Sequence, residues 1–129
     1  MQQAFVPTEI PEPKERDETV RLNRCAQFER LLVITRHSRY DVIVLRGERG
    51  DVLVRGGRLF PSFRRARLDG STAGGSVLKL GSIDAGLHME LNIGGERITT
   101  STILAVRRVG CFRRIGVGEH ESAAKCLRH

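Results

Sequence analysis

The stretch RLDGSTAGG, residues 67–75, combines side chains and glycines that could hold the polar edge of a ligand. The carboxylate of Asp69 can accept hydrogen bonds from backbone N–H groups or from a guanine edge, and the hydroxyl of Ser71 can both donate and accept. Gly70 and Gly74 permit left-handed torsions and let a ligand approach the backbone closely. The same residue types are also typical of an Asx turn between two strands. The stretch is therefore either a ligand-binding loop or a plain turn.

Arginine is the second chemically distinctive feature of the chain. Lysine and arginine together number 22 against 15 acidic residues, which gives a formal net charge of +7, and 19 of the 22 are arginine. A guanidinium group pairs bidentately with phosphate, so this composition favours nucleic acid, phosphorylated ligands or acidic protein partners. A GC-rich genome produces the same bias without any function. The candidates for a phosphate-binding stripe are Arg64, Arg65, Arg67, Arg107, Arg108, Arg113 and Arg114.

The motifs of several common enzyme classes are missing from the sequence. It contains no phosphate loop, no dinucleotide-binding glycine pattern, no nucleophile elbow and no His-Glu-x-x-His pair. We therefore expect a protein that is not an enzyme and carries no cofactor. Cys111, His120, Cys126 and His129 could be drawn as a metal site, but zinc ligands usually come in tighter pairs, so we expect no metal.

Alternating apolar residues and glycine turns predict an all-β fold. Residues 41–45 and 51–55 are β-branched runs on either side of a glycine-containing loop, which is a hairpin pattern. Residues 87–93 alternate in the same way, and the pair Gly94–Gly95 predicts the turn into a return strand over 97–106. With strands before and after residues 67–75, the chain has about six, and closure into a small six-stranded antiparallel β-barrel hides every sheet edge.

The regions flanking this barrel have different patterns. Asp17 can cap a helix, and Leu22, Cys25, Phe28 and Leu32 follow at near-helical spacing, so we expect a helix over 17–35 that packs on the barrel. Three of the four prolines lie before it, which favours a disordered arm. The predicted organisation is an arm over 1–16, the helix over 17–35, the barrel over 36–118 and a C-terminal tail over 119–129.

The chain gives no sign of membrane insertion or export. No apolar run approaches the roughly 18 residues needed to span a bilayer. The N-terminus alternates apolar residues with proline and acid rather than following the order of a secretory signal. We therefore expect a cytoplasmic protein with no membrane span.

The motif Asp69-Gly70-Ser71-Thr72-Ala73-Gly74 has the form Asp-x-Ser-x-x-Gly and resembles the signature loop of PilZ domains. The following IDAGLHMEL, residues 83–91, is similar to the segment that usually comes next in that family. The resemblance covers residues 36–106. It implies a six-stranded barrel that binds the bacterial messenger cyclic di-GMP.

The family's other signature, Arg-x-x-x-Arg, has its positional counterpart in Arg36 and Arg39 of RHSR, which is one residue shorter. The resemblance thus assigns ligand binding to Arg36, Arg39, Asp69, Ser71 and Gly74. It predicts a non-catalytic PilZ-like regulatory module. Two alternatives stay open, a basic barrel that binds nucleic acid through the arginine stripe and a barrel that docks a protein partner.

Overall fold

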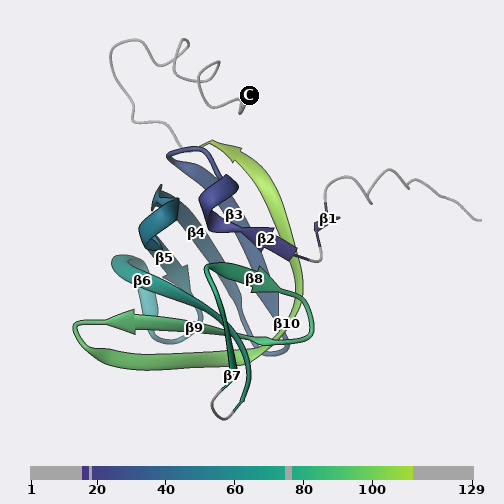
Figure 1. Cartoon of the computed structure of the whole chain (residues 1–129). Helices are drawn as coiled ribbons and strands as arrows, with labels where there is room; N and C mark the ends of the chain where they lie inside the picture. The colour runs from purple at the N-terminus through teal and green to yellow at the C-terminus, as the bar shows by residue number, and fades with distance from the viewer. Residues whose placement is uncertain (1–15, 18, 75–76, 112–129) are drawn as a thin grey trace, which may run out of the picture.

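The computed structural model describes residues 16–17, 19–74 and 77–111. Within these residues the chain forms ten strands and two short 3₁₀ helices (Figure 1). Their bounds, in chain order, are β1 (Arg16–Asp17), β2 (Thr19–Arg21), η1 (Leu22–Arg24), β3 (Glu29–Thr35), β4 (Arg39–Arg46), η2 (Gly47–Arg49), β5 (Asp51–Gly56), β6 (Phe60–Gly74), β7 (Val77–Leu80), β8 (Ser82–Asp84), β9 (His88–Ile93) and β10 (Glu96–Cys111).

Six of these strands form a closed ring of antiparallel pairs. The pairing runs from β3 through β4, β5, β6, β9 and β10 and then returns to β3. β1 adds to β10 and β7 adds to β6, whereas β2 and β8 form a separate pair beside the ring (Figure 1). The all-β antiparallel prediction is confirmed. None of the described residues forms a helix long and apolar enough to cross a membrane.

The hydrophobic core lies inside the ring. Side chains along β3 alternate between buried and half-buried, and Leu31 and Val33 point inward. β4 and β5 contribute the same alternation, because successive side chains of a strand face opposite sides of the sheet. Apolar burial of this kind is the main stabilising contribution to folding. The core is completed by Val42, Val44, Val52, Val54, Leu68, Met89, Leu91 and Ile103, among others.

The predicted helix over residues 17–35 is wrong. The chain there forms β2, the single turn η1 and then β3, which pairs with both β4 and β10. The helical spacing pointed Phe28 and Leu32 inward, but Phe28 is 39% exposed and the fully buried side chains are Leu31 and Val33. The β-branched run that ends β3 favours the extended chain, and two neighbouring strands stabilise it.

The stretch Asp69–Gly74 is neither a turn nor a loop. β6 continues through it, with β7 on one side and β9 on the other. At Gly70 the strand approaches β7 so closely that a Cβ atom would lie 2.1 Å from the carbonyl oxygen of Lys79, and φ there is +150°. The glycine is therefore needed for close contact between strands, not for chain reversal.

Both predicted hairpins are confirmed. β4 pairs with β5 around η2, and Ile93 pairs with Glu96 across the Gly94–Gly95 turn. β10 runs on to Cys111, beyond its predicted end, and the ring already begins at β3 rather than at residue 36. The predicted arm, apart from Arg16 in β1, and the predicted tail lie outside the described residues.

Candidate functional site

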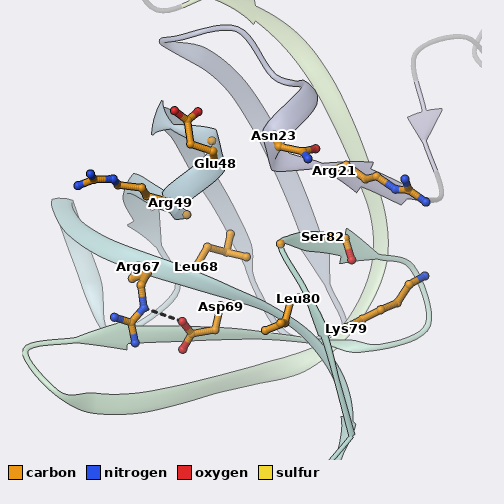
Figure 2. Close-up of a pocket in the computed structure, with 13 residues that line it drawn as sticks. Arg21, Asn23, Glu48, Arg49, Arg67, Leu68, Asp69, Lys79, Leu80 and Ser82 are labelled. Atoms are coloured by element: carbon orange, nitrogen blue, oxygen red, sulfur yellow. Dashed lines mark hydrogen bonds and ion pairs between the residues drawn. The ribbon is translucent and has the colours of Figure 1, made fainter.

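Asp69 lies in the wall of an open cavity of about 540 Å³, which we name the Asp69 cavity (Figure 2). The cavity lies between the two 3₁₀ helices, the middle of β6 and the chain that joins β7 to β8. Its volume is in the range of small-molecule binding sites. The charged side chains that line it are Arg21, Glu48, Arg49, Arg67, Asp69 and Lys79.

Backbone hydrogen bonds hold the walls of this cavity together. The N–H of Leu22 donates to the carbonyl oxygen of Gly81 at 2.9 Å, and the N–H of Gly81 donates to the carbonyl oxygen of Asp69 at 3.0 Å. On the other side, the N–H of Leu68 donates to Gly50 at 2.8 Å. η1 and η2 touch directly, since a Cβ at Gly47 would lie 1.9 Å from the carbonyl oxygen of Leu22. Glycine is therefore required at the contact that joins η1 to η2.

Only one oxygen of the Asp69 carboxylate has a hydrogen-bond partner among the described residues. Its Oδ1 accepts a hydrogen bond from Nε of Arg67 at 2.7 Å, whereas Oδ2 accepts none from the described residues. The hydrogen bond to Asp69 and the charge of its carboxylate raise the pKa of Arg67. One oxygen of Asp69 is thus held in place by Arg67, and the other can accept hydrogen bonds from a ligand.

Two further basic residues at this cavity carry uncompensated charge. Arg21 and Arg49 are exposed, and within the described part of the chain neither forms an ion pair. They lie at opposite rims (Figure 2). The ammonium group of Lys79, by contrast, is held 3.1 Å from Asp84. The described lining residues include four basic and two acidic side chains, so the cavity has a net charge of +2, which favours an anion.

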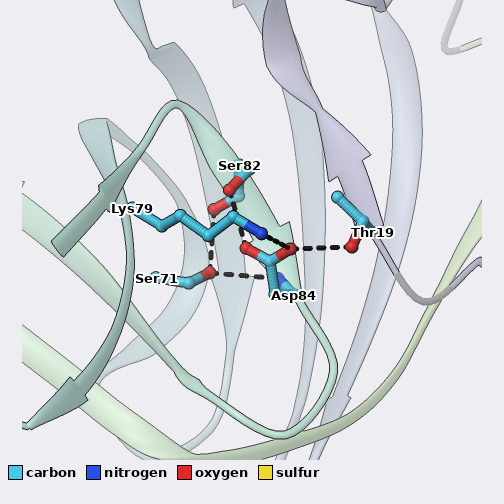
Figure 3. Close-up of polar contacts among 5 residues, drawn as sticks. All are labelled: Thr19, Ser71, Lys79, Ser82 and Asp84. Atoms are coloured by element: carbon cyan, nitrogen blue, oxygen red, sulfur yellow. Dashed lines mark hydrogen bonds and ion pairs between the residues drawn. The ribbon is translucent and has the colours of Figure 1, made fainter.

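Ser71 of the motif does not line this cavity and belongs to a buried polar cluster (Figure 3). Ser71 is fully buried; its hydroxyl donates to the carbonyl oxygen of Ser82 at 2.8 Å and accepts from the N–H of Asp84 at 3.0 Å. The Asp84 carboxylate in turn accepts hydrogen bonds from Thr19 at 2.7 Å, Ser82 at 2.6 Å and Lys79 at 3.1 Å. With both functions of its hydroxyl occupied, Ser71 docks β8 on β6 and does not face the cavity.

The environment of Asp84 favours its ionised form. Burial by itself raises the pKa of this carboxyl group, but the hydrogen bonds from Ser82, Thr19 and Lys79, together with the ammonium charge, outweigh burial and bring the pKa below the ordinary value of 3.8. Asp84 therefore remains charged at neutral pH, as an acceptor that joins β2, β7 and β8.

The predicted site residues are not brought together. The backbone N–H of Arg36 donates to Thr102, and Thr102 pairs with His88, which pairs with Thr72. Strands β9 and β10 therefore separate Arg36 from the motif. Arg39, on β4, lines a second cavity that shares no residue with the Asp69 cavity.

The remaining motif residue, Gly74, ends β6. Its φ is +107°, and a Cβ built there would meet nothing within 4 Å. Gly74 is not among the residues that line the Asp69 cavity. Of the five predicted ligand-binding residues, Asp69 alone lies at this cavity.

The arginines of the predicted stripe do not share one face. Successive residues of a strand point to opposite sides of the sheet, so Arg64 and Arg65 diverge, as do Arg107 and Arg108. Arg65 pairs with Asp51 at 3.4 Å. Arg108 turns to Glu29, at 2.9 Å, and is largely covered. Arg113 and Arg114 lie outside the described residues. Nucleic-acid binding and protein docking stay untested predictions.

Sequence reasoning missed Arg21, Arg49 and Lys79. Each belongs to an element that reaches Asp69 only in the folded chain, and Arg21 lies in the segment assigned to a helix, so no spacing pattern could have identified them. Among the residues that the structure describes, no group of three or more His, Cys, Asp and Glu side chains could hold a metal ion.

Comparisons of this chain with family models, with curated proteins and with solved structures found no significant match.

Proposed function

We propose that this chain is a non-catalytic binding module that binds an anionic nucleotide in the Asp69 cavity. Two observations carry the proposal: Asp69 lines a cavity together with Arg21, Arg49, Arg67 and Lys79, and its Oδ2 accepts no hydrogen bond from the described residues. A carboxylate oxygen accepts hydrogen bonds from the N–H groups of a base, and guanidinium groups bind phosphate.

The division of roles in the cavity follows from the contacts. Arg67 orients Asp69 through the 2.7 Å ion pair, so the carboxylate is in place before a ligand arrives. Arg21 and Arg49 are exposed and lie at the rims, where their long side chains can turn toward a phosphate. A base would thus lie near β6, with its phosphates toward the 3₁₀ helices.

We further propose that the module is PilZ-like and that its ring of strands is the six-stranded barrel of that family. The closed sequence of strand pairs supports this, as does the position of Asp69 at the cavity. In this proposal Arg21 and Arg49 take the place of Arg36 and Arg39, and Ser71 supports the site from within. Cyclic di-GMP in the bacterial cytoplasm is then the first ligand to test.

The absence of catalysis is part of the proposal. Among the described residues that line the cavity there is no histidine, cysteine or tyrosine, and those are frequent acid–base and nucleophilic groups. Of the two carboxylates, Asp69 is paired with Arg67 and Glu48 lies at the edge. The proposed role is therefore recognition of a nucleotide and transmission of its presence to a partner.

Isothermal titration calorimetry with cyclic di-GMP tests the proposal. The wild-type chain should bind with a dissociation constant in the micromolar range, and Asp69→Ala should lower the affinity by at least about tenfold, because a charge-assisted hydrogen bond is lost. Arg21→Gln and Arg49→Gln should each weaken binding severalfold.

Arg97→Gln is the matched control, because Arg97 is an exposed arginine that does not line the cavity. It should leave the affinity within twofold of the wild type. Absence of heat at millimolar cyclic di-GMP, or equal affinity of wild type and Asp69→Ala, would overturn the proposal. GMP in a parallel titration shows whether the second nucleotide contributes.

A further inference from the structure

A second cavity, of about 310 Å³, lies on the outer face of the ring over β3, β4 and β5. Its charged lining residues are Arg30, Arg39, Asp41 and Arg55. Arg39 and Asp41 alternate along β4 with the inward-facing Tyr40 and Val42, so their side chains point away from the core. We name this group the Asp41 pocket.

Asp41 holds two of the guanidinium groups in place. Its Oδ1 accepts from Nε and Nη2 of Arg30 at 3.2 and 3.0 Å, and its Oδ2 accepts from Nη2 of Arg55 at 3.0 Å. The guanidinium carbon of Arg55 also lies 4.3 Å from the centre of the Phe63 ring. Ion pairing restricts the motion of both arginines, and stacking on Phe63 restricts Arg55 further.

These two arginines retain donors for a ligand. A guanidinium group has five N–H donors, and among the described residues Arg30 and Arg55 direct only some of theirs to Asp41. Their side chains are 40% and 43% exposed. The remaining N–H groups are therefore accessible from the solvent.

Arg39 adds a third guanidinium group that is exposed and forms no ion pair within the described part of the chain. Three arginines against one carboxylate leave the Asp41 pocket with a net charge of +2, since the other described lining residues are uncharged. Burial by itself raises the pKa of Asp41, but the hydrogen bonds and charges of Arg55 and Arg30 outweigh burial and bring the pKa below its ordinary value. The carboxylate therefore stays ionised at neutral pH.

We propose that the Asp41 pocket binds a phosphate monoester dianion. Its charge of −2 balances the pocket, and its oxygens suit the forked geometry of the guanidinium groups. A phosphodiester or a carboxylate brings only one negative charge. This site shares no lining residue with the Asp69 cavity, so the inference does not depend on the proposed function.

Phenyl phosphate is the probe that tests this inference. At pH 7.5 it is mostly a dianion, because the second pKa of such esters is about 6. Titration followed by NMR should shift the side-chain Nε–H signals of Arg30 and Arg55, and Arg39→Gln should weaken binding by about tenfold. Arg39 is exposed, so the variant should keep the wild-type spectrum elsewhere.

Arg46→Gln is the matched control, since Arg46 is an exposed arginine on the same strand outside the pocket. It should change the affinity by less than twofold. Methyl phenyl phosphate, a diester of nearly the same shape with one negative charge, should bind at least about tenfold more weakly. Equal binding of the two esters, or equal effects of Arg39→Gln and Arg46→Gln, would overturn the inference.

Discussion

The hydroxyl of Ser71 donates a 2.8 Å hydrogen bond to the carbonyl oxygen of Ser82, at a position where Ser71 is fully buried. This bond and the one from the N–H of Asp84 join β6 to β8, and Asp84 extends the connection to Thr19 on β2. Neighbouring residues of one motif therefore have different roles. Asp69 faces a cavity, whereas Ser71 supports the strand behind it.

Ser71→Ala should destabilise the fold without affecting the surface of the cavity. The substitution leaves the buried carbonyl of Ser82 and the N–H of Asp84 without partners, which costs about 1–3 kcal/mol. Urea denaturation measures the free energy of unfolding directly. Ser62→Ala, on the exposed part of β6, is the control and should change it by less than about 0.5 kcal/mol. Equal effects of the two variants would contradict the role assigned to Ser71.

Asp84 should make stability depend on acid pH. Because its folded-state pKa lies below the ordinary value of 3.8, the ionised group stabilises the fold fully above that value, and the contribution is lost as pH falls through the folded-state pKa. Asp84→Asn should therefore be less stable than the wild type at pH 7, and the difference should shrink below about pH 4. Denaturation of both proteins from pH 7 to 2.5 tests this, and a constant difference would contradict it.

Gly70→Ala should be among the most damaging small substitutions in the chain. The new methyl group would lie 2.1 Å from the carbonyl oxygen of Lys79, at a φ of +150° that alanine rarely adopts. We expect a loss of about 3 kcal/mol or more, or a failure to fold. Gly94→Ala is the control, because φ there is +60° but nothing lies within 4 Å of the new atom. It should cost about 1 kcal/mol, and an equal cost at both positions would remove the steric argument.

Asp69→Ala should weaken ligand binding while leaving the stability of the fold nearly unchanged. The ion pair with Arg67 is partly exposed, with side-chain exposures of 19% for Asp69 and 58% for Arg67, so solvent screens it and its loss should change the stability little. The same variant should lose affinity for cyclic di-GMP. A thermal denaturation curve near that of the wild type checks the first expectation. A large loss of stability would make Asp69 a structural residue like Ser71.

The parts of the fold that were predictable from the sequence are local. The hairpins β4–β5 and β9–β10 join strands that are close in sequence, and their alternation and glycine turns are visible in any short window. The helical spacing of Leu22, Cys25, Phe28 and Leu32 predicts a helix, but only Leu32 of these residues lies in β3. Only its pairing with β10, far away in the chain, makes the strand the stable form.

At the candidate site, too, local sequence predicts the residue types of the Asp69 motif but not their tertiary arrangement. Its residue types could be identified from the sequence, and so could the excess of arginine. Whether the chain reverses within the motif or continues through it as a strand depends on β7 and β9, which pair with Gly70 from either side. The sequence likewise could not show that Ser71 is buried against Ser82.

The all-β class, the local hairpins and the residue types available at Asp69 could all be predicted from the sequence. Which charged side chains lie close together depends on the folded structure. In the fold, Arg21, Arg49 and Lys79 line one cavity with Asp69, and Arg30, Arg39 and Arg55 line another with Asp41. Arg36 lies two strands away from the motif. The physical reason is that closure of the ring pairs strands distant in sequence, and side-chain direction then follows from register.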